Sequence, residues 1–221
     1  MPAIPFNRAN IDVSDRALLA TAIENGHISG NGAFTKQAES SLQDSLGASR
    51  ALLTTSCTHA LEMSALLTKV GPGDEVIVPS FTFVSSASAF LLFGATPIFV
   101  DVEQNSLNID PTALEKAITP RTKAICIVHY GGISADLDKI LEIAKANNLA
   151  VIEDNAHGLF STYKGKPLGG FGNLATQSFH ETKNITCGEG GALLINDESL
   201  VERAEILREK GTDRTKFLRG Q

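Results

Sequence analysis

Short apolar runs alternate along this chain with longer segments in which apolar residues recur every three or four positions. The first pattern predicts buried β-strands, and the second predicts helices with one buried face. Strands are expected at residues 51–54, 75–78, 97–100, 123–128 and 149–153, and helices at 14–25, 34–46, 59–69, 82–93, 111–118 and 136–147. Strands and helices in alternation predict an α/β fold, with a mainly parallel sheet and flanking helices.

The pattern changes after residue 154, where shorter glycine-rich segments follow one another at 159–163, 175–179 and 191–195. A charged segment at 197–210 predicts a last helix. Ser14 and Asp110 are suited to begin helices as N-caps, while Gly26 and Gly47 are placed to end them. No internal repeat or low-complexity tract interrupts the alternation, so the sequence predicts one sizeable α/β unit.

Composition and charge exclude some classes of partner. The 221 residues carry 19 basic and 25 acidic side chains, a formal net charge of -6, which argues against nucleic acid as a partner. Residues 76–100 are uncharged, but Pro79 and Pro97 interrupt them, so a strand, a turn and a buried helix fit better than a membrane span. The N-terminus lacks the pattern of a signal peptide. We therefore expect a cytoplasmic protein with no membrane partner.

Metal chemistry has little support in the sequence. Cys57, Cys126 and Cys187 are too few and too scattered for a disulfide framework or a C-x-x-C metal motif. The histidines include no pair spaced by three or four residues, as one face of a helix would need to ligate zinc. They stand at positions 27, 59, 129, 157 and 180. No metal site is expected.

The residues that directly follow apolar runs are the candidates for chemistry, because ligands of open α/β sheets bind at the carboxyl ends of the strands. Ser56-Cys57-Thr58 joins an expected strand to an expected helix, which could form a phosphate cradle from hydroxyls and free N–H groups. From this fragment alone, an ordinary Ser/Thr N-cap is the favoured interpretation. No G-x-G-x-x-G or Walker pattern follows a strand, which weighs against a dinucleotide or nucleoside triphosphate fold.

Asp154 ends an expected strand and His157 follows three residues later. A carboxylate at such a place can orient and charge a ring nitrogen. Alternatively, Asp154 caps a turn and His157 is a core histidine. The sequence alone leaves both interpretations open.

Lys183 and Phe83 are the remaining candidates. Residues 167–180 contain no Asp, Glu, Lys or Arg, so Lys183 follows a segment of low charge. Desolvation there would disfavour the ammonium form and make the amine a better nucleophile, although surface lysines are far more common. Phe83 is by default a core residue, and it could instead present its ring face to a flat ligand.

Five segments together resemble the sugar aminotransferases of the DegT/DnrJ/EryC1/StrS family. They are TSCTHAL at 55–61, GPGDEVI at 71–77, PSFTFVS at 79–85, IEDNAH at 152–157 and SFHETKN at 178–184. The family uses pyridoxal 5'-phosphate (PLP), so the resemblance implies the large domain of the PLP-dependent transferase fold type I, as in aspartate aminotransferase. Other segments, such as STYKG at 161–165, resemble members that form dTDP-4-amino-4,6-dideoxygalactose.

The resemblance also implies roles for individual residues. Lys183 would attach to the coenzyme and shuttle a proton, and Asp154 would keep the pyridinium nitrogen protonated. The expected contacts are Phe83 and His157 to the ring, and Thr58, the His59 backbone N–H and Ser178 to the phosphate. The implied reaction moves an amino group from L-glutamate to C4 of dTDP-4-keto-6-deoxyglucose and releases 2-oxoglutarate.

The resemblance finally implies a domain organisation and partners. Residues 1–221 would form the PLP-binding large domain, with an N-terminal helical segment at about 1–47, and the family's smaller C-terminal domain would lie outside this chain. A homodimer with a shared active site is expected, and the chain alone is expected to associate and to bind coenzyme weakly. Another keto sugar as substrate, or a truncated protein without turnover, remain alternatives.

Overall fold

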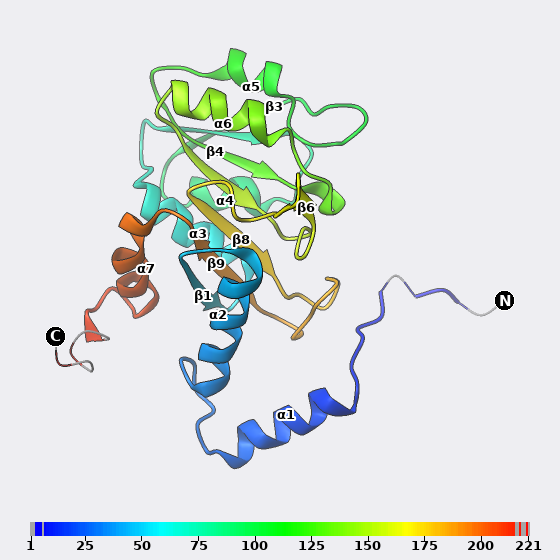
Figure 1. The fold of residues 1–221 in the computed structure, drawn as a ribbon. Coiled ribbons are helices and arrows are strands. Elements are labelled where there is room, and N and C mark those ends of the chain that lie inside the picture. Colours follow the sequence, from blue (N-terminus) through cyan, green and yellow to red (C-terminus); the bar gives the residue numbers. More distant parts are fainter. Residues whose placement is uncertain (1–2, 6, 215–216, 218–219, 221) are drawn as a thin grey trace.

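A seven-stranded sheet with helices on both faces forms the body of the protein (Figure 1). The computed structural model describes residues 3–5, 7–214, 217 and 220. The strand order is β1-β9-β8-β5-β4-β2-β3, and β6 and β7 form a separate hairpin. The strands are β1 (Arg50–Thr54), β2 (Glu75–Pro79), β3 (Thr96–Val100), β4 (Thr122–Val128), β5 (Ala150–Asp154), β6 (Thr162–Tyr163), β7 (Lys166–Pro167), β8 (Leu174–Ser178) and β9 (Gly191–Ile195).

Helices precede or connect most of these strands. They are α1 (Val13–Glu24), α2 (Ala33–Leu46), α3 (Cys57–Thr68), α4 (Ser85–Leu91), α5 (Pro111–Ala117), α6 (Leu137–Ala146) and α7 (Val201–Arg208), with short 3-10 turns at Tyr130–Gly132 and Glu198–Leu200. Asp110 caps α5 and Gly47 ends α2 with a φ of 70°, as the sequence predicts. Among the described residues, no helix is long and apolar enough to cross a membrane.

The predicted α/β fold with a mainly parallel sheet is confirmed. Strands β3, β2, β4, β5 and β8 pair in parallel, whereas β9 runs antiparallel to both of its neighbours, β8 and β1. A parallel return requires a crossover, usually a helix. The chain between β8 and β9 contains no such helix, so β9 returns beside β8 in the opposite direction.

The two faces of the sheet bury separate cores. Ile152 of β5 packs in a cluster with side chains of α3 and α4, and its neighbour Val151 packs in a second cluster with α5 and α6. Successive strand residues point to opposite faces, and this alternation separates the two clusters. Asp154, two residues after Ile152, therefore lies on the face that α3 and α4 cover. The sheet thus directs this carboxylate away from α5 and α6.

The N-terminal helical segment has two parts that behave differently. Helix α2 packs Leu42 and Leu46 into the core, whereas α1 has no buried residue and stands apart from the body (Figure 1). The N-cap expected at Ser14 is wrong, because the N-cap of α1 is Asp12, two residues earlier. Asp12 accepts the Ser14 N–H at 2.7 Å and also the Ser14 hydroxyl at 2.6 Å, so the carboxylate caps the helix.

Two predicted helices are shorter in the structure. The helix expected at 82–93 is confined to α4, because turns formed by Phe83 and Val84 carbonyls precede it and Gly94, with a φ of 84°, follows it. The helix expected at 197–210 is divided into a 3-10 turn and α7. Asp197 caps that turn through the Ser199 N–H, and Lys210, with a φ of 64°, lies beyond the helix.

A buried carboxylate ties α2, β1 and α7 together. Glu39 is 1% exposed; it accepts from Arg208 at 2.9 Å, Arg50 at 3.1 Å and the Leu53 N–H at 3.1 Å. Arg50 and Leu53 belong to β1, and Arg208 belongs to α7. The charge of Glu39 is thus compensated from several sides in a place that excludes water.

Replacing Glu39 by alanine is expected to lower the free energy of unfolding by about 3 kcal/mol, because the arginines would be left without their buried partner. Denaturant unfolding would measure the loss. The matched control is Asp138→Ala, which removes an exposed ion pair with Lys164 and should cost at most about 0.5 kcal/mol. Equal losses in the two variants would show that Glu39 contributes no more than a surface charge.

Candidate active site

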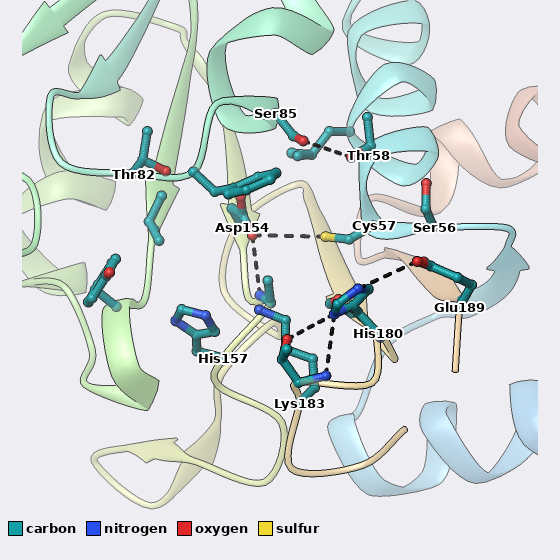
Figure 2. A pocket seen from close by; sticks show the side chains of 18 residues that line it. Ser56, Cys57, Thr58, Thr82, Ser85, Asp154, His157, His180, Lys183 and Glu189 are labelled. Carbon is teal, nitrogen blue, oxygen red and sulfur yellow. Dashed lines mark hydrogen bonds and ion pairs between the residues drawn. The ribbon is translucent and has the colours of Figure 1, made fainter. Parts of the chain in front are cut away.

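A cavity of about 500 Å³ opens at the carboxyl ends of the parallel strands, and 18 residues line it (Figure 2). Its walls come from the segments that follow β1, β2, β4, β5 and β8, together with the residues just before β9. This is where an open α/β sheet binds ligands. Six of the seven predicted site residues line this cavity: Thr58, Phe83, Asp154, His157, Ser178 and Lys183.

The N-terminus of α3 forms one wall. Ser56 is its N-cap, and its hydroxyl accepts the His59 N–H at 3.1 Å. The first intrahelical bond runs from the Ala60 N–H to the Ser56 carbonyl, so the N–H groups of Cys57 and Thr58 precede the helical ladder. Such N–H groups, with the positive end of the helix dipole, form an anion-binding site. The cap and the cradle are therefore the same structure.

Close backbone packing holds this wall in place. Gly191, the first residue of β9, lies so near the start of α3 that a Cβ atom would come within 2.4 Å of the Cys57 nitrogen. Only glycine allows this approach. The Thr58 hydroxyl is 2.7 Å from the Ser85 hydroxyl at the start of α4. Helix α3, helix α4 and β9 thus meet at one corner of the cavity.

Asp154 lies at the end of β5 and is 5% exposed. Its Oδ2 accepts the Ser86 hydroxyl at 2.6 Å, and its Oδ1 accepts the Ala156 N–H at 3.2 Å. The Cys57 sulfur lies 4.0 Å from Oδ1 and 3.4 Å from the Thr176 hydroxyl. Burial, and then the charge of Asp154, raises the pKa of the Cys57 thiol above its usual range, so this sulfur keeps its proton.

Lys183 is half-buried in the loop between β8 and β9 and lines the cavity. Figure 2 shows it across the cavity from Asp154 and Cys57. Burial lowers the pKa of the Lys183 ammonium, against the opposing effect of the Asp154 charge. The amine therefore loses its proton at a lower pH than a surface lysine does. This is the property that a nucleophilic lysine needs.

His157 takes part in the cavity, and it is not a core histidine, because its side chain is exposed. Its Nδ1 accepts the Gly131 N–H at 3.2 Å, so the neutral ring carries its proton on Nε2. Burial of part of the ring, followed by the charge of Lys183, lowers the pKa of His157. The imidazole is therefore mostly neutral at neutral pH.

Phe83 and His59 differ from the simplest sequence interpretation. Phe83 is 73% exposed at the cavity, so the default assignment to the core is wrong. The His59 side chain does not line the cavity, and its backbone N–H already donates to Ser56. Ser178, at the end of β8, is 7% exposed and does line it. An apolar ring face and a hydroxyl are thus available to a ligand there.

Several cavity residues were not singled out from the sequence: Thr82, Tyr130, His180 and Glu189. Tyr130 follows β4, and its ring lies 4.5 Å from that of Phe81 and 5.4 Å from that of His157. The rule that selected Asp154, a polar residue just after an apolar run, would have found Tyr130 as well. His180 pairs with Glu189 at 3.5 Å, and loop geometry of this kind leaves no signal in the sequence.

Glu153, the carboxylate next to Asp154, has a structural role. Glu153 is fully buried on the opposite face of β5, where it accepts from His129 at 2.9 Å and from the N–H groups of Gly169, Phe171 and Gly172. Burial acts to raise the pKa of Glu153, but these hydrogen bonds outweigh burial and the pKa is lowered. In the described part of the chain, no three metal-ligating side chains come together.

Comparison with known proteins shows the family to which the chain belongs. The model of the DegT/DnrJ/EryC1/StrS aminotransferase family matches residues 9–220, and the chain therefore belongs to that family. It is 39% identical over 216 residues to the spore coat polysaccharide biosynthesis protein SpsC of Bacillus subtilis, covering 98% of this chain and 55% of SpsC. It is 40% identical over 213 residues to the GDP-perosamine synthase of Caulobacter vibrioides, covering 96% and 57% of the two chains.

Solved structures of similar sequence have the same fold. The crystal structure of 3-amino-5-hydroxybenzoic acid synthase matches with a TM-score of 0.87 at 38% identity, over 93% of this chain and 54% of that one. The PLP form of the putative sugar aminotransferase Spr1654 from Streptococcus pneumoniae matches with a TM-score of 0.83 at 33% identity, over 93% and 56%. The chain thus spans about half the length of the relatives it matches.

Proposed function

We propose that this chain is the coenzyme-binding large domain of a PLP-dependent aminotransferase that acts on a nucleotide-linked keto sugar. The observation that carries the proposal is one cavity that joins a half-buried lysine, a buried carboxylate and the N-terminus of helix α3. These groups match the three functional parts of PLP: an aldehyde, a ring nitrogen and a phosphate. The PLP form of Spr1654, which has the same fold, supports this match.

Each group of the coenzyme has a partner in this chain. The N–H groups at the start of α3, with the hydroxyls of Thr58 and Ser178, would hold the phosphate. Asp154 would face the ring nitrogen, and Phe83 and His157 would contact the ring. We keep the His59 N–H as a phosphate donor in this proposal, on condition that the phosphate displaces the Ser56 hydroxyl from it.

When bound, PLP supplies an electron sink that lets the amino acid carbon lose a proton. The Asp154 carboxylate would hold the proton on the ring nitrogen. Lys183, whose pKa burial lowers, would bind the aldehyde carbon and then carry the proton between the substrate carbon and the coenzyme. The neutral His157 can donate from Nε2 to a coenzyme oxygen. Metal chemistry has no part in this scheme.

For the substrates, we propose L-glutamate as amino donor and dTDP-4-keto-6-deoxyglucose as acceptor, giving dTDP-4-amino-4,6-dideoxygalactose and 2-oxoglutarate. The motifs shared with family members of that activity support this choice, whereas the printed name of the Caulobacter relative points to a GDP-linked sugar. Assembly as a homodimer in the cytoplasm belongs to the same proposal. A panel of dTDP-, UDP- and GDP-linked keto sugars, read by 2-oxoglutarate release, would distinguish these acceptors.

Trapping tests the coenzyme site directly. The purified chain is saturated with PLP, reduced with borohydride to fix the lysine–coenzyme linkage, and digested for peptide mass mapping. We expect the label on the peptide that contains Lys183. A labelled peptide elsewhere, or no label in coenzyme-saturated protein, would contradict the proposal.

Removal of the Phe83 ring is expected to weaken PLP binding about tenfold, because stacking contributes about 0.5–1.5 kcal/mol beyond burial. Absorbance titration with PLP would measure the affinity of Phe83→Ala. Phe93→Ala is the matched control, since Phe93 packs against the core on the α3 and α4 face. If both variants bind PLP equally well, Phe83 does not stack on the coenzyme.

A further inference from the structure

A chain of hydroxyls leads from the cavity wall to the carboxylate of Asp154. The Thr82 and Ser86 hydroxyl oxygens are 2.7 Å apart, and Ser86 donates to Asp154 Oδ2 at 2.6 Å. Ser86 is fully buried and Asp154 is 5% exposed. Thr82 and Asp154 line the cavity, whereas Ser86 lies behind them. The serine therefore reaches the site only through its two neighbours.

The carboxylate of Asp154 fixes which hydroxyl donates and which accepts in this row of hydrogen bonds. A carboxylate only accepts hydrogen bonds, and a serine hydroxyl has one proton to give. Since Ser86 gives that proton to Asp154, the Thr82 hydroxyl must donate to Ser86. Hydrogen bonds that point the same way polarise and strengthen one another, and a bond to a charged acceptor is stronger than one between neutral groups. Thr82 is then left with only acceptor capacity toward the cavity.

The other oxygen of the carboxylate is held from the opposite direction. Oδ1 accepts the Ala156 N–H at 3.2 Å, and the Cys57 thiol lies 4.0 Å away, too far to hold it firmly. Ser86 thus makes the shortest contact to Asp154 and the only one from α4 among the described residues. This contact comes from the first turn of α4, which begins at Ser85.

We propose that Ser86, supported by Thr82, is a positioning residue for Asp154. It fixes the rotation of the carboxylate about its side-chain torsions, so that the negative charge is held in one orientation toward the cavity. This inference rests on the proposed function, because the value of a fixed orientation lies in the partner that Asp154 faces. Ser86 itself does not touch the coenzyme or the substrate.

A double-mutant cycle on PLP affinity tests the proposal. In the otherwise unmodified protein, Ser86→Ala is expected to weaken PLP binding about tenfold. In the Asp154→Asn variant, the same substitution should change PLP affinity less than twofold. Thr82→Val, which removes the support for Ser86 together with one hydroxyl of the cavity wall, should weaken binding about twofold. Ser86→Thr keeps the hydroxyl and should restore most of the affinity. A merely structural serine would weaken binding equally in both backgrounds.

The control is Ser64→Ala, which removes another fully buried serine hydroxyl, one that donates within α3 to the Ala60 carbonyl. It should leave PLP affinity within twofold of the unmodified chain. Denaturant unfolding of the same four proteins without PLP measures the Ser86–Asp154 contact independently of the coenzyme. The effects of the two substitutions on the free energy of unfolding should also be coupled. Unchanged affinity in Ser86→Ala, beside an unmodified chain that binds PLP, overturns the positioning role alone. An unmodified chain that binds no PLP overturns the proposed function, and the positioning role with it.

Discussion

Replacing Lys183 by alanine is expected to lower amino-group transfer by about 10³-fold or more, since the variant loses both the nucleophilic amine and the group that moves the proton. The rate of 2-oxoglutarate release from glutamate and a keto sugar nucleotide would measure this. PLP should still bind, because the start of α3 and Asp154 are unchanged. A small added amine should restore part of the rate, as it can replace the missing side chain in the emptied space.

Lys166→Ala is the matched control for this prediction. Lys166 is exposed in β7, and its ammonium lies 4.6 Å from the Phe171 ring centroid, away from the cavity. It should transfer amino groups at the unmodified rate. Lys183→Ala with more than a tenth of the normal rate would mean that another base moves the proton.

The sequence predicts most of the architecture because β2, β3, β4 and β5 carry apolar runs. Val151 and Ile152 are buried on opposite faces, so both positions of β5 are apolar, and Asp154 follows them at the end of the strand. The same reasoning places Ser56 to Thr58 after β1. Strand ends are thus visible in sequence, and in a parallel sheet they meet at one edge.

The site is less predictable where a contact depends on tertiary packing. Phe83 looks like a core residue in sequence, yet it is exposed, because the turns before α4 place it at the cavity. Ser86 is one hydroxyl in a run rich in small residues. Only the packing of α4 against β5 shows that it, rather than its neighbour Ser85, donates to Asp154.

Helix ends depend on local competition that periodicity does not record. Asp12 takes the cap position from Ser14 because a carboxylate accepts two backbone N–H groups and the serine hydroxyl together. Likewise, Asp197 forms a 3-10 turn before α7. Neither difference moves a site residue, since the chemistry lies at the strand ends. This explains why a coarse prediction of the fold was enough to find the cavity.

Asp154→Asn is expected to keep PLP bound but to lower the rate of transfer more than a hundredfold. The variant retains the size of the side chain, and its one amide oxygen can still accept from either Ser86 or Ala156. It loses the negative charge, however, and a hydrogen bond to a charged group contributes about 1.5–3 kcal/mol, or about 10- to 100-fold. The electron sink needs the proton that this charge holds on the ring nitrogen, so the loss in rate should exceed that range.

Two measurements separate this effect from a loss of structure or of coenzyme. Absorbance titration should show PLP affinity within about tenfold of the unmodified chain, while the release of 2-oxoglutarate falls at saturating PLP. Asp138→Asn removes a surface carboxylate on α6 and should change neither quantity. If Asp154→Asn turns over near the normal rate, another residue protonates the ring. The carboxylate at the end of β5 would then serve only to hold Ser86 and the start of the following loop.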